Sequence, residues 1–201
     1  MVIRGPQSPR RDGGPDYCFE CSISQIIRRK LRPTQNILRF CSVRFRGTFT
    51  VDLPVGWVRL SPDIGGDFRD TITLTRDGLS IQHITARRRS HEAAFPSLNK
   101  SVAPDILPTE LAEFAIAEIK SSQDLTEYTV LTNAPTTISR HTGFRLHMRS
   151  KNPSGLNYEG VVYGFVDEGG FYYLEYWATR LHYFERDLAN FEQAVASFRL
   201  T

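Results

Sequence analysis

Two kinds of hydrophobic spacing organise the chain from Thr48 onward. In seven short runs, apolar residues alternate with polar ones or lie close together between turn residues, a pattern typical of strands. These runs cover residues 48–54, 70–78, 79–85, 126–133, 143–150, 157–166 and 171–179. The pattern therefore predicts three strands, an interval, and then four further strands.

Helical spacing appears at two places between and after these runs. Thr109 is a suitable N-cap for a helix that ends near Ser122, and acidic residues follow it in the first turn. The C-terminal region carries a single apolar stripe with steps of 4, 3, 4 and 3 residues, made of Phe184, Leu188, Phe191, Val195 and Phe198. We expect both helices to pack on the sheet.

The turns indicate how the strands connect. Asp77-Gly78 and the segment 167–170 (DEGG) are hairpin signals, so the sheet should be largely antiparallel. The last two runs are apolar or aromatic on both faces, which requires a helix on each side of the sheet. The predicted fold is α+β, an α/β/α sandwich of about seven strands and two main helices, plus a disordered N-terminal tail.

Charge separates the tail from this patterned region. Residues 1–46 hold ten Lys and Arg and three acidic residues, a net charge of +7, whereas residues 47–201 hold fifteen and nineteen, a net charge of −4. We therefore expect a basic tail over 1–46 and one domain over 47–201. The negative domain also argues against nucleic-acid binding, in spite of the overall charge of +3.

Three interpretations of the tail are open. It is a solvated disordered segment, or a basic arm that binds nucleic acid or an anionic membrane. The third interpretation is that the start of the reading frame is miscalled or frame-shifted, so that these residues do not belong to the natural protein. Arg and Lys interrupt every apolar run, so no secretory signal is legible. If the start of the reading frame is miscalled, Cys41 stands where a bacterial lipoprotein carries its lipidated cysteine. In that case the protein would attach to a membrane only through a lipid on Cys41.

Cys18 and Cys21 have the spacing of a metal or redox motif, but a zinc site needs four ligands. The next cysteine is Cys41 and the first histidine is His83. We therefore predict no metal or other cofactor.

The start of the domain resembles a known family. The run Phe49-Thr50-Val51-Asp52-Leu53-Pro54-Val55-Gly56-Trp57 is similar to the F-x-V-x-L-P-x-G-W opening of PsbP-like domains. The C-terminal segment 191–198 resembles their closing helix, which ends in Ser-Phe. That group includes photosystem subunits, a eukaryotic Ran-GTPase-binding factor and bacterial lipoproteins. The resemblance implies an α/β/α sandwich and a location in the bacterial periplasm or envelope. It also implies a protein that acts through contacts with other proteins and not as an enzyme.

Candidate surface residues lie at two places. Arg87, Arg88 and Arg89 form a basic segment that we expect in a loop, where it could meet an acidic partner. Arg145 and His147 alternate on one face of a predicted strand. These five residues are the predicted partner surface.

The sequence contains no motif of an enzyme. It has no nucleophile elbow, phosphate loop or dinucleotide fingerprint. Glu159 and Glu175 could face each other across the last hairpin, and a cleft lined by His83, His147 and Glu175 would favour a hydrolase.

The sequence thus leaves three functional hypotheses. The first is a non-enzymatic, envelope-associated factor that binds an unidentified protein partner or assists assembly. The second is a carrier with a pocket for a small molecule or lipid between the sheet and a helix. The third is a hydrolase of an unrecognised type.

Overall fold

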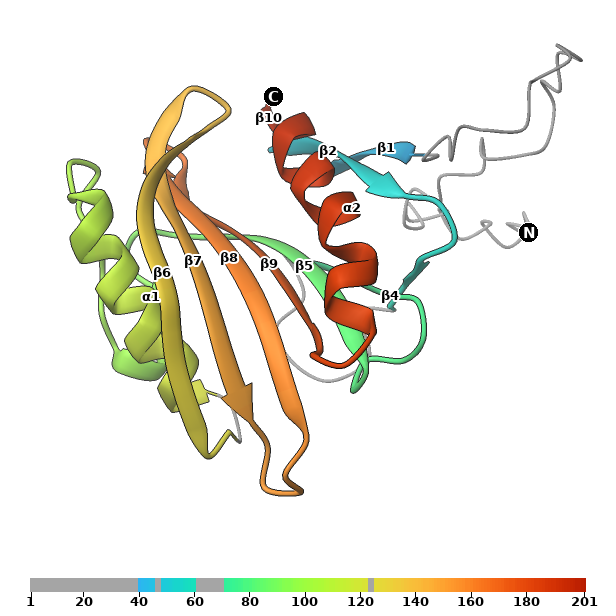
Figure 1. Ribbon diagram of the computed structural model, residues 1–201. Helices are drawn as coiled ribbons and strands as arrows, with labels where there is room; N and C mark the ends of the chain where they lie inside the picture. Colours follow the sequence, from blue (N-terminus) through green and yellow to red (C-terminus); the bar gives the residue numbers. More distant parts are fainter. Residues whose placement is uncertain (1–39, 46–47, 61–70, 123–124) are drawn as a thin grey trace, which may run out of the picture. The chain divides into compact units, whose positions relative to one another are not determined.

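The computed structural model describes residues 40–45, 48–60, 71–122 and 125–201. Within these ranges, the chain forms a seven-stranded sheet, a small three-stranded sheet and two helices of 15 residues each (Figure 1). The elements, in chain order, are β1 (Phe40–Phe45), β2 (Phe49–Pro54), β3 (Val58–Arg59), β4 (Thr71–Thr75), β5 (Gln82–Arg89), the 3₁₀ helix η1 (Pro96–Leu98), α1 (Pro108–Ser122), β6 (Glu127–Ile138), β7 (His141–Lys151), β8 (Asn157–Asp167), β9 (Gly170–Thr179), α2 (Tyr183–Ser197) and β10 (Arg199–Leu200).

The seven-stranded sheet has the order β3-β4-β5-β9-β8-β7-β6, and every neighbouring pair is antiparallel. Helix α1 packs on β6, β7 and β8, whereas α2 packs on β5, β8 and β9 and against β2 of the small sheet (Figure 1). Adjacent residues of β8 belong to different cores, Val161 to the α2 side and Val162 to the α1 side. The predicted α/β/α sandwich is therefore confirmed.

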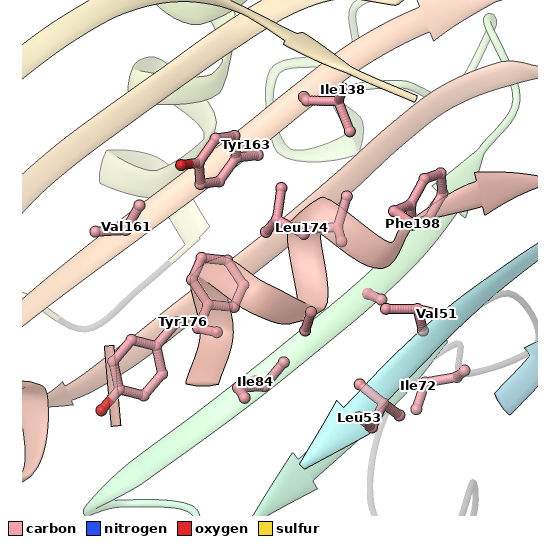
Figure 2. Close-up of a cluster of buried hydrophobic side chains, with 14 of the residues drawn as sticks. Val51, Leu53, Ile72, Ile84, Ile138, Val161, Tyr163, Leu174, Tyr176 and Phe198 are labelled. Carbon is pink, nitrogen blue, oxygen red and sulfur yellow. The ribbon is translucent and has the colours of Figure 1, made fainter. Parts of the chain in front are cut away.

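Aromatic side chains fill the core on the α2 side. Phe198 stacks on Phe49 with ring centroids 5.0 Å apart, and Tyr176 stacks on Phe184 at 5.7 Å. Figure 2 shows Phe198 and Tyr176 in this cluster, together with Leu174, Ile84 and Val51. The predicted stripe of α2 thus faces the sheet, with Phe184, Phe191 and Val195 buried.

The core on the α1 side is built from the alternate residues of the same strands. Phe144, Leu146 and Met148 of β7 are at most 1% exposed and pack with the apolar face of α1. Gly160 lies under the indole of Trp177, where a Cβ atom would overlap the ring. Both helix–sheet interfaces are thus closely packed.

The structure corrects the predicted boundary of the domain. Residues 40–45, assigned to the basic tail by charge, form β1 and pair along their whole length with β2, from Phe40 opposite Pro54 to Phe45 opposite Phe49. The prediction of disorder for the preceding residues, including Cys18 and Cys21, lies outside the described residues.

Two further elements differ from the sequence prediction. Strand β6 was expected to end near Asn133 before Pro135, but it continues to Ile138. Because β6 is an edge strand, it can include a proline, which has no N–H to donate. The Arg87–Arg89 segment was expected in a loop, but it forms the last three residues of β5.

Candidate functional site

Strand β7 carries a row of three basic side chains on the α2 side of the sheet. We call Arg145, His147 and Arg149 the β7 row. Their side chains are 30%, 22% and 42% exposed, while the residues between them are buried in the other core. The alternation predicted from the sequence is therefore correct, and it places the β7 row beside α2.

The buried carboxylate of Glu159 on β8 holds part of this row. Glu159 is 4% exposed, and its oxygens lie 2.7 Å from His147 Nε2, 3.0 Å from Arg149 Nε and 3.7 Å from Arg180 Nε. The imidazole of His147 also stacks on the ring of Phe184, with centroids 5.4 Å apart. One carboxylate thus orients three basic groups, of which Arg149 and Arg180 reach the surface.

Arg145 is held by a second acidic residue, Glu192 of α2. Its Nη2 lies 2.7 Å from Glu192 Oε1, and its Nε donates to the Tyr163 hydroxyl at 2.8 Å. Burial and a hydrogen bond to Glu192 raise the pKa of Tyr163, so the phenol stays neutral. Although burial alone would lower the pKa of Arg145, Glu192 and Tyr163 raise it. The guanidinium is therefore a fixed, permanent charge.

The three arginines at the end of β5 do not join the β7 row. Arg87 and Arg89 face the α1 side, where Arg87 pairs with Glu175 and Arg89 Nη1 lies 2.8 Å from the Ala94 carbonyl oxygen. Arg88 points to the opposite face and donates to the Gly169 carbonyl. Strand alternation therefore separates Arg88 from Arg87 and Arg89, and the five predicted surface residues do not form one surface.

The proposed acidic pair and hydrolase cleft are also excluded by alternation. In the β8–β9 register, Glu175 is opposite Val162, whereas Glu159 is opposite Ala178, so the two carboxylates lie on opposite faces of the sheet. His83 is on the face of Glu175, and His147 is on the other. These groups therefore cannot line one cleft.

Glu175 is surrounded by groups that stabilise its ionised form. Burial alone would raise the pKa of this 3% exposed carboxyl, but Arg87, His83 and the indole N–H of Trp177, 3.1 Å from Glu175 Oε2, lower it. Burial lowers the pKa of His83, although the charge of Glu175 partly opposes this effect. The neutral imidazole and the ionised carboxylate are thus the favoured states on this face.

The apolar residues between the sheet and each helix are buried in two cores, one on each face of the sheet. Four aromatic residues of β9 are buried in these cores: Tyr172, Tyr173, Tyr176 and Trp177. No group of three or more His, Cys, Asp or Glu in the described ranges could hold a metal ion. None of the helices in this part of the chain is long and apolar enough to cross a membrane.

The position of β6 at the edge of the sheet and its full length were not predicted from the sequence. The strand is 12 residues long, it pairs only with β7 in the described sheet, and most of its side chains are exposed. A register shift between Val130 and Thr132 marks a bulge. The β-branched residues after Pro135 (Thr136, Thr137 and Ile138) were the available signal that the strand continues.

Comparison with solved structures finds this fold in proteins of very different sequence. The Ran-binding protein Mog1p of Saccharomyces cerevisiae aligns over 81% of this chain and 96% of its own, with 10% identity and a TM-score of 0.56. Cyanobacterial PsbP (CyanoP) from Synechocystis sp. PCC 6803 aligns over 85% of this chain and 98% of its own, with 9% identity and a TM-score of 0.58. No protein-family model and no curated protein sequence matches the chain. The chain therefore has the Mog1/PsbP-like fold that its opening and closing motifs indicate.

Proposed function

We propose that this protein is a non-enzymatic binding or assembly factor that pairs an extended segment of a partner protein with the edge of β6. The observation that carries the proposal is the exposed, 12-residue strand at the end of the seven-stranded sheet. An edge strand presents backbone N–H and C=O groups that can pair with another chain. Addition of a peptide strand to such an edge is a common mode of recognition.

The composition of β6 supports this use. Proteins commonly protect long edges with charged side chains, especially lysine. After Glu127, β6 contains no charged residue up to Ile138. The bulge at Leu131 and Pro135 are the two protective features that this edge carries. The docking segment that we propose is Thr129–Ala134, which spans the bulge and ends before Pro135.

The β7 row would select among partners by charge. On the α2 side, the β6 residues opposite the row are small: Thr129 is opposite Arg149, Thr132 is opposite His147, and Ala134 is opposite Arg145. Arg145 pairs with Glu192 of α2 and Arg149 with Glu159 of β8, so their positive charge would act on an added strand across these small residues. Acidic side chains on that strand would be favoured, because complementary charge increases both association rate and specificity.

Binding of a partner protein is also the role that the yeast structural neighbour suggests. Mog1p is described as a Ran-binding protein, and we carry over only the general class of function, protein binding. The envelope location and lipidation at Cys41 stay predictions. Cys41 lies in β1 opposite Leu53 of β2, so an attached lipid would start at the small sheet.

The proposal can be tested by site-specific photo-crosslinking in cells of the native organism. A photoreactive phenylalanine analogue would replace Thr132 or Ala134 on β6, and, as a matched control, exposed Gln193 on α2. We expect protein adducts from the β6 positions and few from Gln193. Hydrogen exchange of the purified complex should then show protection of the β6 amides.

The variant Thr132→Lys places a protective charge on the edge without removing a backbone hydrogen bond. It should leave the thermal midpoint unchanged and abolish the β6 adducts, whereas Gln193→Lys should abolish none. Equal adducts at Thr132 and Gln193, or unchanged adducts from the Ala134 position in the Thr132→Lys protein, would contradict the proposal.

A further inference from the structure

A basic hollow lies at the turn between β6 and β7, away from the docking segment on β6. It has a volume of about 640 Å³ and is lined by Thr137, Ser139, Arg140, His141, Arg199 and Leu200. We call this set the basic hollow. Its lining combines the β6–β7 hairpin with β10, segments almost 60 residues apart in the sequence. Only tertiary structure brings them together.

The side chains of the basic hollow are suited to an anion. Two guanidinium groups, an imidazole and two hydroxyl groups line it, and no acidic residue does. A further arginine lies on the same side of the small sheet, because Arg44 and Arg199 are both in register with Thr50. Arginine donors match the oxygens of phosphate in a bidentate geometry.

Two of the basic groups are held in place by other contacts. Arg199 Nη1 lies 2.8 Å from the carbonyl oxygen of Ala196 and 2.6 Å from that of Phe198, at the end of α2. A guanidinium has five N–H groups, so donors remain after these two contacts. The ring of His141 stacks on Phe165, with centroids 4.9 Å apart. Such preorganisation reduces the entropy lost on binding.

The turn itself places an arginine where the backbone favours another residue. Ile138 pairs with His141, and the two residues between them, Ser139 and Arg140, have φ values of 48° and 74°. Asn-Gly is the preferred sequence for a two-residue hairpin with positive φ at both positions. The side chain of Arg140 therefore has a conformational cost that glycine would remove.

We propose that the basic hollow binds a phosphate dianion, free or as the monoester of a small molecule. The chemistry that carries this proposal is the convergence of Arg140, His141 and Arg199 with two hydroxyl groups and without an acidic residue. The site goes beyond the protein-binding role of β6 and does not depend on it.

The test is a titration of the full-length ¹⁵N-labelled protein with sodium phosphate at constant ionic strength, followed by NMR. We expect saturable shifts of the amides of Arg140, His141, Arg199 and Leu200, and no saturable shifts with sodium chloride. Glycerol phosphate should bind at the same place. Non-saturable shifts, or the same response to chloride, would overturn the proposal.

Two variants separate binding from folding. Arg140→Gly removes the guanidinium but relieves the positive φ, so the thermal midpoint should be unchanged or higher while phosphate affinity falls at least fivefold. Arg199→Gln should weaken binding to a similar extent. The control Arg59→Gln changes an exposed arginine outside the basic hollow and should have no effect. Wild-type affinity in Arg140→Gly would overturn the proposal.

Two further binding measurements distinguish a small phosphate ligand from a phosphorylated peptide or a lipid headgroup. Binding to a phosphoserine peptide or to phosphatidic acid vesicles at least tenfold tighter than to glycerol phosphate would overturn the assignment to a small ligand. Thr132→Lys on β6 should leave phosphate binding unchanged, so that failure of the docking proposal and failure of this one can be told apart.

Discussion

Glu175 and Glu159 are both buried carboxylates of the central sheet, on opposite faces and in different surroundings. Glu175 pairs with Arg87, whose side chain is 25% exposed, and accepts a hydrogen bond from Trp177. Glu159 contacts His147, Arg149 and Arg180, two of which are 42% and 52% exposed. The same residue type therefore stabilises the interior on one face and orients a basic surface on the other.

The largest effect is expected from Glu175→Ala. This change leaves the Arg87 guanidinium partly buried without its carboxylate, and removal of one partner from a buried pair typically costs about 3–5 kcal/mol. We expect a loss near the lower end, about 3 kcal/mol, because Arg87 retains some contact with water. Urea denaturation would measure it. A loss below about 1 kcal/mol would show that the pair contributes little.

The second prediction concerns acid stability and also depends on the Glu175 face. The pKa of His83 is lowered in the folded protein by burial, and that of Glu175 is lowered chiefly by Arg87. The unfolded chain then binds more protons, so the free energy of unfolding should fall as the pH drops below about 6.5, the ordinary value for histidine, and further below about 4.5. Urea midpoints between pH 8 and pH 4 would record this.

His83→Gln provides the control for this pH dependence. It removes the group that titrates first, so the decline between pH 7 and pH 5 should become shallower while the decline below pH 4.5 is kept. The same slope in both proteins would assign the acid sensitivity to other groups.

A smaller effect is expected from Glu159→Gln on the opposite face. Arg149 and Arg180 can turn toward water when the carboxylate is lost, so the cost in the free energy of unfolding should be about 1 kcal/mol. The β7 row would lose its orientation, and crosslinking from β6 should decrease. A stability loss as large as that of Glu175→Ala would contradict the distinction between the two faces.

The smallest effect is expected from Arg149→Gln. This arginine is partly exposed, and such ion pairs contribute at most about 1 kcal/mol, often nothing measurable. The free energy of unfolding should therefore change by less than about 0.5 kcal/mol, whereas crosslinking to an acidic partner should fall. Unchanged crosslinking would remove Arg149 from the docking surface.

Local patterns in the chain were sufficient to identify most of the fold. The alternation in 143–150 and the 4-3-4-3 stripe of α2 each reflect one buried face, and burial of apolar surface is the dominant driving force. The short strands β1, β3 and β10 were missed. Strand β1 has the basic composition of the tail, and β3 and β10 have two residues each, too few to show a period.

The candidate sites were predicted only in part. Alternation correctly placed Arg145 and His147 on one face, because side-chain direction in a strand follows from position. Glu159 and Glu192, which hold these side chains, were not identified as their partners, since strand pairing and helix docking decide which acid lies opposite which base. For the same reason, Arg87 was not identified as the partner of Glu175.

The amino-acid sequence by itself determined the secondary structure of the core, the two-sided burial of β8 and β9, and hence the sandwich. Tertiary structure alone decided that β6 is an exposed edge, that β1 belongs to the domain, and that Arg140 and Arg199 line one hollow. The physical reason is the separation in sequence of the residues that interact. Hydrophobic periodicity is a local property of the chain, whereas edges, ion pairs and hollows depend on contacts between residues distant in sequence.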